Sequence, residues 1–427
     1  MAQTSTRGHR SRKLALLGGS TTARDCIIAL GHILNPRRLV DGPDISAYED
    51  AFAKVVDTGH AISFAAGRVG LYGILKAAGI GAGDEVLLQV PTHIVVANAI
   101  RYTGAQPVYV DCELDSYNID LDQADAQVTP RTRALILQHT FGIPVDMDRA
   151  AEIASRNGLL LIEDCVHALG ARYRGRPVGS LSAAAFFSTE ETKTISTTMG
   201  GMVTTGDPAL AEKVRSFQAS CSSPSASTVI RYLLKLVIYY GLTEPSVHRY
   251  SRAAYELLGR RHPLPRPTVL EELQGRKPPG YERRFSNGQA AVALEQLRKL
   301  PRNLAHRRRA ADGWEHALRD HGFRLPKPPE GAEPAYVRYP VWVDDRERVV
   351  QALESRLVVG TWFTSVLEEA LDPAVGAYVA GSCPRAEEAA RHLINLPTHG
   401  RVSSRDVAEI SEVLISTAPT GIPSPAA

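Results

Sequence analysis

Short apolar segments alternate with helical patterns from residue 60 to 205, and this alternation limits the fold more than any other feature of the chain. Several of these segments are apolar throughout, as strands buried on both faces of a sheet are. We therefore expect an α/β protein whose mainly parallel, seven-stranded sheet is covered by helices. The expected strands are residues 61–64, 85–90, 107–111, 134–137, 159–163, 184–187 and 202–205, with helices at 69–78, 95–102, 150–156 and 209–217.

The rest of the chain has a different texture. A serine-rich stretch (220–227), a helical pattern (229–260) and a stretch with prolines at 263, 265, 267, 278 and 279 form an excursion over 220–280. A long helix is expected at 289–318, followed by strands at 339–343 and 358–362 and helices at 346–356, 386–393 and 404–416. We predict an N-terminal segment (1–40), a large domain (41–290), a linker helix with a small C-terminal α/β domain (291–416), and a disordered tail (417–427).

Charge and cysteine content argue against several classes of protein. Forty-nine Lys and Arg residues against 46 Asp and Glu give a net charge of +3, too balanced for a nucleic-acid binder. The five cysteines are odd in number, widely spaced and without a Cys-x-x-Cys pair, which argues against a disulfide framework or a zinc ribbon. The 13 histidines show no metal-ligand spacing, and no secretory signal is recognised. We expect a cytoplasmic protein without a bound metal.

The most lipophilic window is VIRYLLKLVIYYGL, residues 229–242. Arg231 and Lys235 interrupt it, and it is shorter than the roughly 20 residues needed to cross a bilayer. We interpret it as an amphipathic helix packed on the body of the protein or on a partner chain, and we do not expect membrane contact. A lipid-contacting role is the alternative.

Two of the expected strands are followed by residues that could take part in catalysis. The apolar segment 159–162 delivers Asp164 at its carboxyl end, where open α/β sheets place ligands. The next strand, 184–187, is followed by a hydroxyl-rich turn that contains Lys193. Together they match the needs of pyridoxal phosphate, which requires a lysine to hold it as a Schiff base and a carboxylate to keep its ring nitrogen protonated.

A third element fits the phosphate of that cofactor. Residues 65–70 follow the first strand and open a helix, so their backbone N–H groups are available to an anion. Gly67 permits close approach of the backbone, and Arg68 adds positive charge.

At this point the chain resembles the DegT/DnrJ-type sugar aminotransferases, a branch of the fold-type-I pyridoxal-phosphate enzymes. The resemblance runs from about residue 42 to 414 and rests on motifs in the family's order. They are GAGDEVLL (81–88), NAIRYTGAQPVYVD (98–111), VTPRTRA (128–134), HTFGIPVDMD (139–148), LLIEDCVHALGARYRGRPVGS (160–180), FFSTEETK (186–193), GGMVTT (200–205), RRFSNGQAAVALEQL (283–297) and LINLPTHGRVSSRDV (393–407).

The resemblance implies catalytic roles for two residues. Lys193 would carry the cofactor and shuttle the substrate proton, and Asp164 would pair with the ring nitrogen. It also implies that His167 bonds the cofactor's phenolic oxygen and that His93 stacks on its ring.

The phosphate would be held by the turn Gly67, Arg68 and Val69, by Ser188, and by Arg284 reaching across a homodimer from the partner chain. The chain departs from the family at Glu282, which would repel a phosphate at close range. Glu190 and Glu191 add negative charge beside Lys193.

These features predict transamination from an amino acid, Glu or Gln, to a keto or aldehyde acceptor, most simply a nucleotide-linked keto-sugar or a cyclitol. Lys193 argues against the family's dehydratase branch, which has histidine there. Two alternatives stay open: another pyridoxal-phosphate reaction such as carbon–carbon bond formation, and a non-catalytic regulatory protein that binds the cofactor. Trp362 is interpreted as a core or interface residue, the alternative being contact with substrate.

Overall fold

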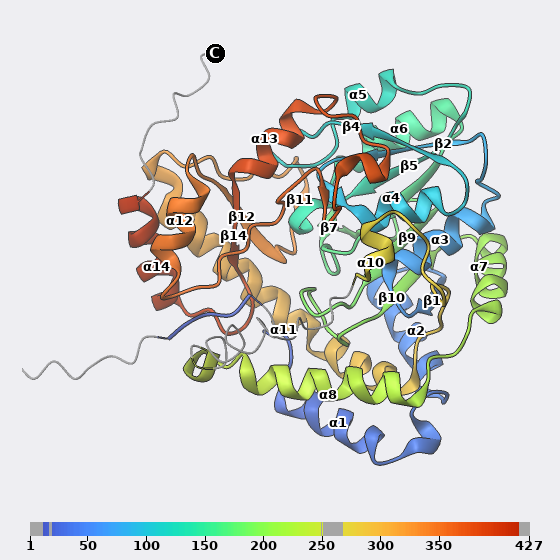
Figure 1. The fold of residues 1–427 in the computed structure, drawn as a ribbon, viewed down its shortest axis with the longest axis horizontal. Coiled ribbons are helices and arrows are strands. Elements are labelled where there is room, and N and C mark those ends of the chain that lie inside the picture. Colours follow the sequence, from blue (N-terminus) through green and yellow to red (C-terminus); the bar gives the residue numbers. More distant parts are fainter. Residues whose placement is uncertain (1–11, 17–18, 249, 251–267, 418–427) are drawn as a thin grey trace, which may run out of the picture.

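A seven-stranded sheet forms the centre of the protein in this computed structural model, which describes residues 12–16, 19–248, 250 and 268–417 (Figure 1). The strand order is β1-β10-β9-β6-β5-β2-β4. Neighbours are parallel from β9 to β4, whereas β10 runs antiparallel to both β1 and β9. The strands are β1 (His60–Phe64), β2 (Glu85–Gln89), β4 (Gln106–Val110), β5 (Thr132–Gln138), β6 (Leu160–Asp164), β9 (Ala184–Ser188) and β10 (Gly201–Thr205).

The sequence pattern predicted all seven of these strands, and the expected α/β class with a mainly parallel sheet is confirmed. Their ends differ from the expected ones by at most two residues. The pattern works here because most residues of these strands are buried, so that apolar runs persist over their whole length.

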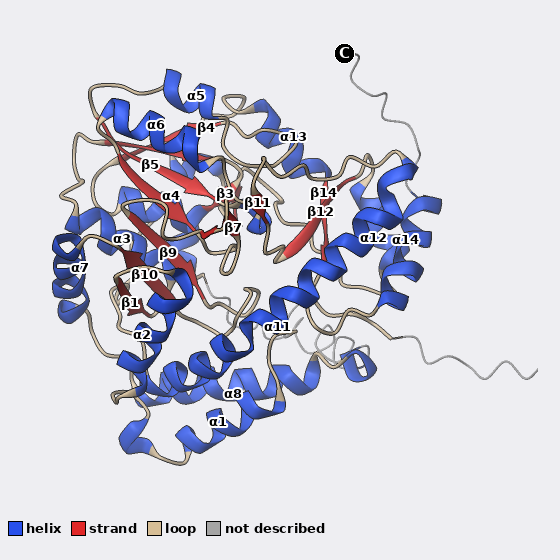
Figure 2. Cartoon of the chain, turned by 180° about the vertical axis from the view of Figure 1, so that it is seen from behind, coloured by secondary structure: helices blue, strands red, loops and turns tan. Residues whose placement is uncertain are grey.

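Helices cover both faces of the sheet (Figure 2). One apolar core lies between the sheet and α3, α4 and α7. Two further cores lie on the opposite face, one beneath α5 and α6 and one beneath α2 and the start of α11. These helices are α2 (Asp44–Val56), α3 (Gly67–Ala77), α4 (Ile94–Arg101), α5 (Leu121–Ala126), α6 (Met147–Asn157), α7 (Pro208–Ser220) and α11 (Asn287–Leu318).

The long helix α11 leads into a second α/β unit with its own core. There β12 (Arg338–Trp342) pairs antiparallel with β14 (Leu393–Pro397). Trp314 of α11 is fully buried in this core and donates its indole N–H to Pro397 O at 3.0 Å. The other helices of this unit are α12 (Arg346–Leu353), α13 (Pro384–His392) and α14 (Ser404–Thr417).

One strand prediction in this unit is wrong. Residues 358–362 form no strand; Gly360 alone bridges to Asn395. The place beside β12 is taken by β14, whose first residue, Leu393, was expected to end a helix. A five-residue apolar run that directly follows a helix cannot be distinguished from that helix's last turn by periodicity.

Among the described residues of the excursion 220–280 are α8 (Ala226–Leu242), α10 (Leu270–Leu273) and a helical stretch at 245–248. Helix α1 (Ala23–Ile33) packs beside α8. The helix expected over 229–260 ends at Leu242, three residues before Pro245, which cannot donate a helical hydrogen bond. Residues 251–260, three of the five prolines and the tail from 418 lie outside the described residues. No described helix is both long and apolar enough to cross a membrane.

Short strand pairings complete the fold. β3 (Thr92–His93) pairs in parallel with β13 (Leu367–Glu368). This pairing connects the C-terminal unit to the segment that follows β2, at the carboxyl end of that strand. β7 (Arg172–Tyr173), β8 (Arg176–Pro177) and β11 (Ala332–Glu333) form a small antiparallel sheet.

Candidate active site

A cavity of about 330 Å³ lies at the carboxyl ends of the central strands. Its lining brings together the ends of β5, β6 and β9, the start of α3, and residues 359–369 of the C-terminal unit. Open α/β sheets bind ligands at this edge, because the loops that follow parallel strands converge there. The predicted site residues that line it are Gly67, Arg68, His93, Asp164, Ser188 and Lys193.

Lys193 is buried in the loop that follows β9. Its Nζ donates to His167 Nε2 at 3.1 Å and lies 5.4 Å from the centroid of the Trp362 ring. Burial lowers the pKa of Lys193 to about 8, with Arg338 acting in the same direction and Glu190 and Asp164 opposing. A neutral, nucleophilic amine is therefore accessible near physiological pH.

Asp164 is the last residue of β6 and is almost fully buried. Its Oδ1 accepts from Val166 N at 3.1 Å, while its Oδ2 has no hydrogen-bond partner among the described residues. Burial raises the pKa of Asp164 to about 7, opposed by the Val166 N–H and by Lys193. An unpaired buried carboxylate oxygen of this kind fits a cationic N–H group of a ligand.

His167 lies between Lys193 and the aromatic residues of the site. Its ring is 4.5 Å from that of Trp362, centroid to centroid, and its Nδ1 has no partner among the described residues. Burial lowers the pKa of His167 well below its ordinary value, and Lys193 adds to this effect. The imidazole is therefore neutral, and its Nε2 accepts a hydrogen bond from the Lys193 amine.

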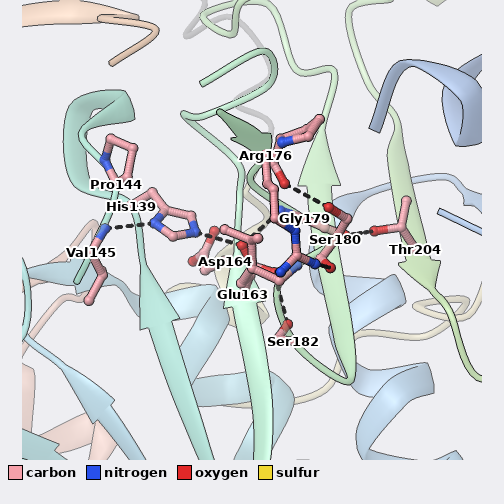
Figure 3. Close-up of polar contacts among 12 residues, drawn as sticks. His139, Pro144, Val145, Glu163, Asp164, Arg176, Gly179, Ser180, Ser182 and Thr204 are labelled. Carbon is pink, nitrogen blue, oxygen red and sulfur yellow. Dashed lines mark hydrogen bonds and ion pairs between the residues drawn. The ribbon is translucent and has the colours of Figure 1, made fainter. Parts of the chain in front are cut away.

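Glu163 points to the opposite face of the sheet from Asp164, as neighbouring residues of a strand do (Figure 3). Its carboxylate accepts from Gly179 N at 2.7 Å, Leu181 N at 2.9 Å and Ser182 Oγ at 2.9 Å. His139 Nδ1 accepts from Val145 N, so its Nε2 carries the proton and donates to Glu163 at 3.1 Å.

This network makes the His139, Glu163 and Cys165 cluster structural. The three residues lie close enough to share a metal ion. Their lone pairs are nevertheless engaged by four donors to Glu163 and one to His139. Cys165 is a small buried thiol, and burial raises its pKa well above the usual value.

The first turn of α3 is an open anion site. Ala66 occupies the N-cap and has no side chain that could cap the helix, and Gly67 is packed against Phe187 O and the Ser188 side chain. The start of β10 presses on the same turn, because a Cβ added to Gly201 would lie 2.4 Å from Gly67 N. The predicted phosphate residues Gly67 and Ser188 are thus adjacent, at a helix N-terminus, which is a favourable place for an anion.

Val69 and Arg68 also lie in this turn, with Val69 buried and its N–H bonded to Ala66 O. The Arg68 guanidinium contacts the excursion, with its Nε 2.7 Å from Glu272 Oε1.

The site also contains residues that the sequence did not single out for it. Arg338, on β12, lines the cavity and is 9% exposed, with its guanidinium carbon 5.5 Å from the Trp362 ring centroid. Among the described residues no carboxylate lies within ion-pair distance of it. The sequence signal that could have identified Arg338 as a site residue is an arginine within an otherwise apolar strand. Trp362, interpreted mainly as a core residue, lines the cavity too.

His93 caps α4 and links the two units. Its Nδ1 accepts from Val95 N at 3.3 Å, and its Nε2 lies 3.3 Å from Glu369 Oε2. The ring is one-quarter exposed at the cavity wall.

The acidic departures from the family pattern are compensated within the chain. Glu282 forms an ion pair with Lys277, which also lies 4.2 Å from the centroid of the Tyr72 ring. Glu191 is paired with Lys235 of α8 at 2.7 Å, so of the two glutamates beside Lys193 only Glu190 lines the main cavity.

Arg284 lies where the chain returns from the excursion. Its backbone bridges to Phe64 at the end of β1, and its guanidinium donates to Ser223 Oγ. The Nε of Arg284 has no partner among the described residues.

The fold is that of the fold-type-I pyridoxal-phosphate aminotransferases. The structure of S. venezuelae DesV in complex with a ketimine intermediate matches with a TM-score of 0.73 and 28% identity, over 92% of this chain and 94% of that one. The chain belongs to the DegT/DnrJ/EryC1/StrS aminotransferase family, whose sequence model matches residues 22–415.

Two relatives place the chain within this family of pyridoxal-phosphate-dependent enzymes. It is 31% identical to GDP-perosamine synthase of Caulobacter vibrioides over 386 residues, covering 88% of this chain and 91% of the relative. It is 42% identical over 190 residues to dTDP-3-amino-3,4,6-trideoxy-alpha-D-glucose transaminase of Streptomyces venezuelae, 44% of this chain and 50% of the relative.

Glu163→Gln tests the network behind Asp164. The side-chain NH2 group of glutamine cannot accept hydrogen bonds, so some of the donors from His139, Gly179, Leu181 and Ser182 would lose their acceptor. The free energy of unfolding should therefore fall by about 3 kcal/mol. Urea unfolding followed by tryptophan fluorescence measures this. The control is Glu152→Gln on the exposed side of α6, which should change stability by no more than about 0.5 kcal/mol. Equal midpoints for the two variants would contradict the assignment.

Gly201→Ala tests the packing of β10 against the phosphate turn. The added Cβ meets the Ala66 and Gly67 backbone, so the variant should lose about 1–3 kcal/mol of stability and bind inorganic phosphate and pyridoxal phosphate more weakly. Gly206→Ala is the matched control, since its Cβ meets nothing within 4 Å. Calorimetric titration of both variants measures the affinities, and unchanged affinity in Gly201→Ala would refute the packing argument.

Proposed function

We propose that this protein is a pyridoxal-phosphate-dependent aminotransferase that moves an amino group from an amino acid to a nucleotide-linked keto-sugar. The observation that carries the proposal is the meeting, in one cavity, of a buried lysine, an unpaired buried carboxylate oxygen and an uncapped helix N-terminus. The names of the two relatives, a GDP-sugar synthase and a dTDP-sugar transaminase, support the choice of acceptor. A cyclitol acceptor is the second candidate.

The residues present fit the cofactor. Asp164 Oδ2 offers the carboxylate that a protonated ring nitrogen needs, and the first turn of α3 with Ser188 offers donors for the phosphate. His93 lines the cavity, and His167 contacts Lys193 and the Trp362 ring. The family resemblance assigns His167 to the phenolic oxygen and His93 to the ring face. When bound, pyridoxal phosphate supplies an electron-withdrawing ring that acidifies the hydrogen on the amine-bearing carbon of the donor.

Lys193 then acts as the base at that carbon. Burial lowers its pKa to about 8, so it can hold or release a proton near neutral pH. His167 Nε2, 3.1 Å away, orients the amine, and Trp362 shields it from water.

The ion pairs of Glu282 and Glu191 weaken the case for the alternative functions. The unusual charges at Glu282, Glu190 and Glu191 motivated the alternative of carbon–carbon bond formation. Lysines of the same chain pair with Glu282 and Glu191, and only Glu190 remains at the cavity wall. A regulatory protein that only binds the cofactor needs no lysine with a lowered pKa.

The proposal includes a homodimer in the cytoplasm. Arg284 lies beside the end of β1, and its Nε is unpaired among the described residues, which supports its reaching a phosphate in the partner chain. The division into domains at 41–290 and 291–416 belongs to this proposal as well.

The decisive experiment maps the lysine. Protein loaded with pyridoxal phosphate, reduced with borohydride and digested should carry the label on Lys193, and attachment should speed up as pH rises through about 8, because the neutral amine attacks. In a separate sample that has not been reduced, added glutamate should be converted to 2-oxoglutarate, one molecule per bound cofactor. Lys193→Ala should lose both signals. A label on another residue, or no 2-oxoglutarate, would refute the proposal.

Arg338 is the residue that we assign to the donor's carboxylate. It is nearly buried, faces the cavity beside Lys193, and has no carboxylate partner among the described residues. Burying an unpaired charge is costly, and a charged ligand group that completes the pair recovers that cost. An amino acid donor brings such a carboxylate into the site at every turnover.

Arg338→Met should raise KM for the amino donor roughly 100-fold, the loss of about 3 kcal/mol from a charge-assisted contact. The half-reaction with the keto-sugar should be affected much less. Arg324→Met is a suitable control, because Arg324 also lies 5.5 Å from a tryptophan ring centroid, that of Trp342, but does not line the cavity. Steady-state kinetics with donor and acceptor varied separately would show the difference, and equal effects on both substrates would contradict the assignment.

A further inference from the structure

Exposed apolar side chains gather on α1 and α8. Of the twelve large hydrophobic residues that are exposed in the described part of the chain, eight lie on these two helices or within eight residues after their ends. They are Ile27, Leu30, Leu34, Leu234, Ile238, Leu242, Val247 and Tyr250, with exposed fractions from 40% to 84%. Scattered exposed leucines are ordinary in proteins, whereas such a concentration indicates an interaction surface.

Each helix is apolar on two sides. In α8, Val229, Leu233 and Leu236 are buried against α1 and α11, while Leu234, Ile238 and Leu242 form an exposed stripe at a spacing of four residues. In α1, Cys26 and Ala29 are buried, and Ile27, Leu30 and Leu34 form a second exposed stripe. Packing on the protein therefore accounts for only one side of each helix.

The two helices lie side by side along one edge of the molecule, on the far side of α11 from the small unit's strands (Figures 1 and 2). Neither stripe lines the cavity that contains Lys193. The exposed surface is thus separate from the candidate active site.

The charges around the stripes are mainly basic. Over residues 23–40 and 226–242, every exposed charged side chain is basic, and the one acid, Asp25, is fully buried against Lys299. Asp41 and Glu244, just beyond these ranges, are exposed acids, and Glu244 is paired with Arg401. Arg24 and Lys235 have carboxylate partners in the body of the protein. Arg37, Arg38 and Arg231 have none within ion-pair distance among the described residues.

From these observations we infer that the α1–α8 face docks on an anionic phospholipid bilayer surface. Aliphatic stripes can enter the headgroup boundary while flanking arginines meet lipid phosphates and Tyr250 stays at the interface. A second copy of the chain is the less favourable occupant. A two-fold contact would bring together two copies of the same surface, each with the same excess of arginine.

The experiment is cosedimentation of the full-length, cofactor-loaded enzyme with vesicles. Wild type should bind vesicles of phosphatidylglycerol mixed with phosphatidylcholine, and bind pure phosphatidylcholine far less. The double variant Leu234→Glu/Ile238→Glu should lower the bound fraction more than tenfold with unchanged activity in solution. Arg37→Glu/Arg38→Glu should weaken binding most at low salt.

Matched controls come from the C-terminal unit. Leu371 and Val379 are 62% and 70% exposed, so Leu371→Glu/Val379→Glu removes as much exposed apolar surface elsewhere and should leave vesicle binding unchanged. Light scattering gives the mass of each variant. Absence of binding to the anionic vesicles overturns the inference. A halved mass of Leu234→Glu/Ile238→Glu without a change in vesicle binding overturns it too, and identifies a second copy as the occupant.

Discussion

The buried carboxylate of Glu163 is the interaction on which the geometry of the site depends. Four donors converge on it, from His139 on one side and from the turn at residues 179–182 on the other. The end of β6 is thereby fixed between β5 and β9, so Asp164 projects into the cavity on the opposite face with one oxygen unpaired. The hydrogen-bonded carboxylate of Glu163 on one face of the sheet thus fixes the position of Asp164, whose Oδ2 is unpaired, on the other face.

The central sheet and its catalytic edge could be predicted because their signals are local. Buried parallel strands are apolar along their length, and Asp164 and Lys193 each lie at or just beyond the end of such a strand. Residues outside that pattern were harder. Arg338 comes from β12, almost 150 residues after Lys193, and only the packing of the C-terminal unit brings it to the cavity. The missed strand β14 and the misassigned segment 358–362 are likewise choices made by tertiary pairing, not by periodicity.

Charge compensation at the site also depends on contacts that sequence spacing cannot reveal. Glu191 is two residues from Lys193, but its partner Lys235 comes from α8, and Glu272, which pairs with Arg68, comes from α10. Read from the sequence alone, the acids beside the lysine suggested an unusual substrate or reaction. In the folded chain the excursion that supplies these partners removes most of the anomaly, leaving Glu190 as the acid at the cavity wall.

The excursion therefore has two roles that a single helix can combine. One side of α8 packs against α1 and α11 and places Lys235 beside the lysine loop, whereas the other side carries an apolar stripe to the surface. The stability of the fold does not require the exposed apolar stripe of α8, because Leu and Ile side chains that stay in water do not stabilise the folded state and raise the risk of association. The inner face of α8 thus supports the active-site loop through Lys235, and its outer face is the one that we assign to a docking contact.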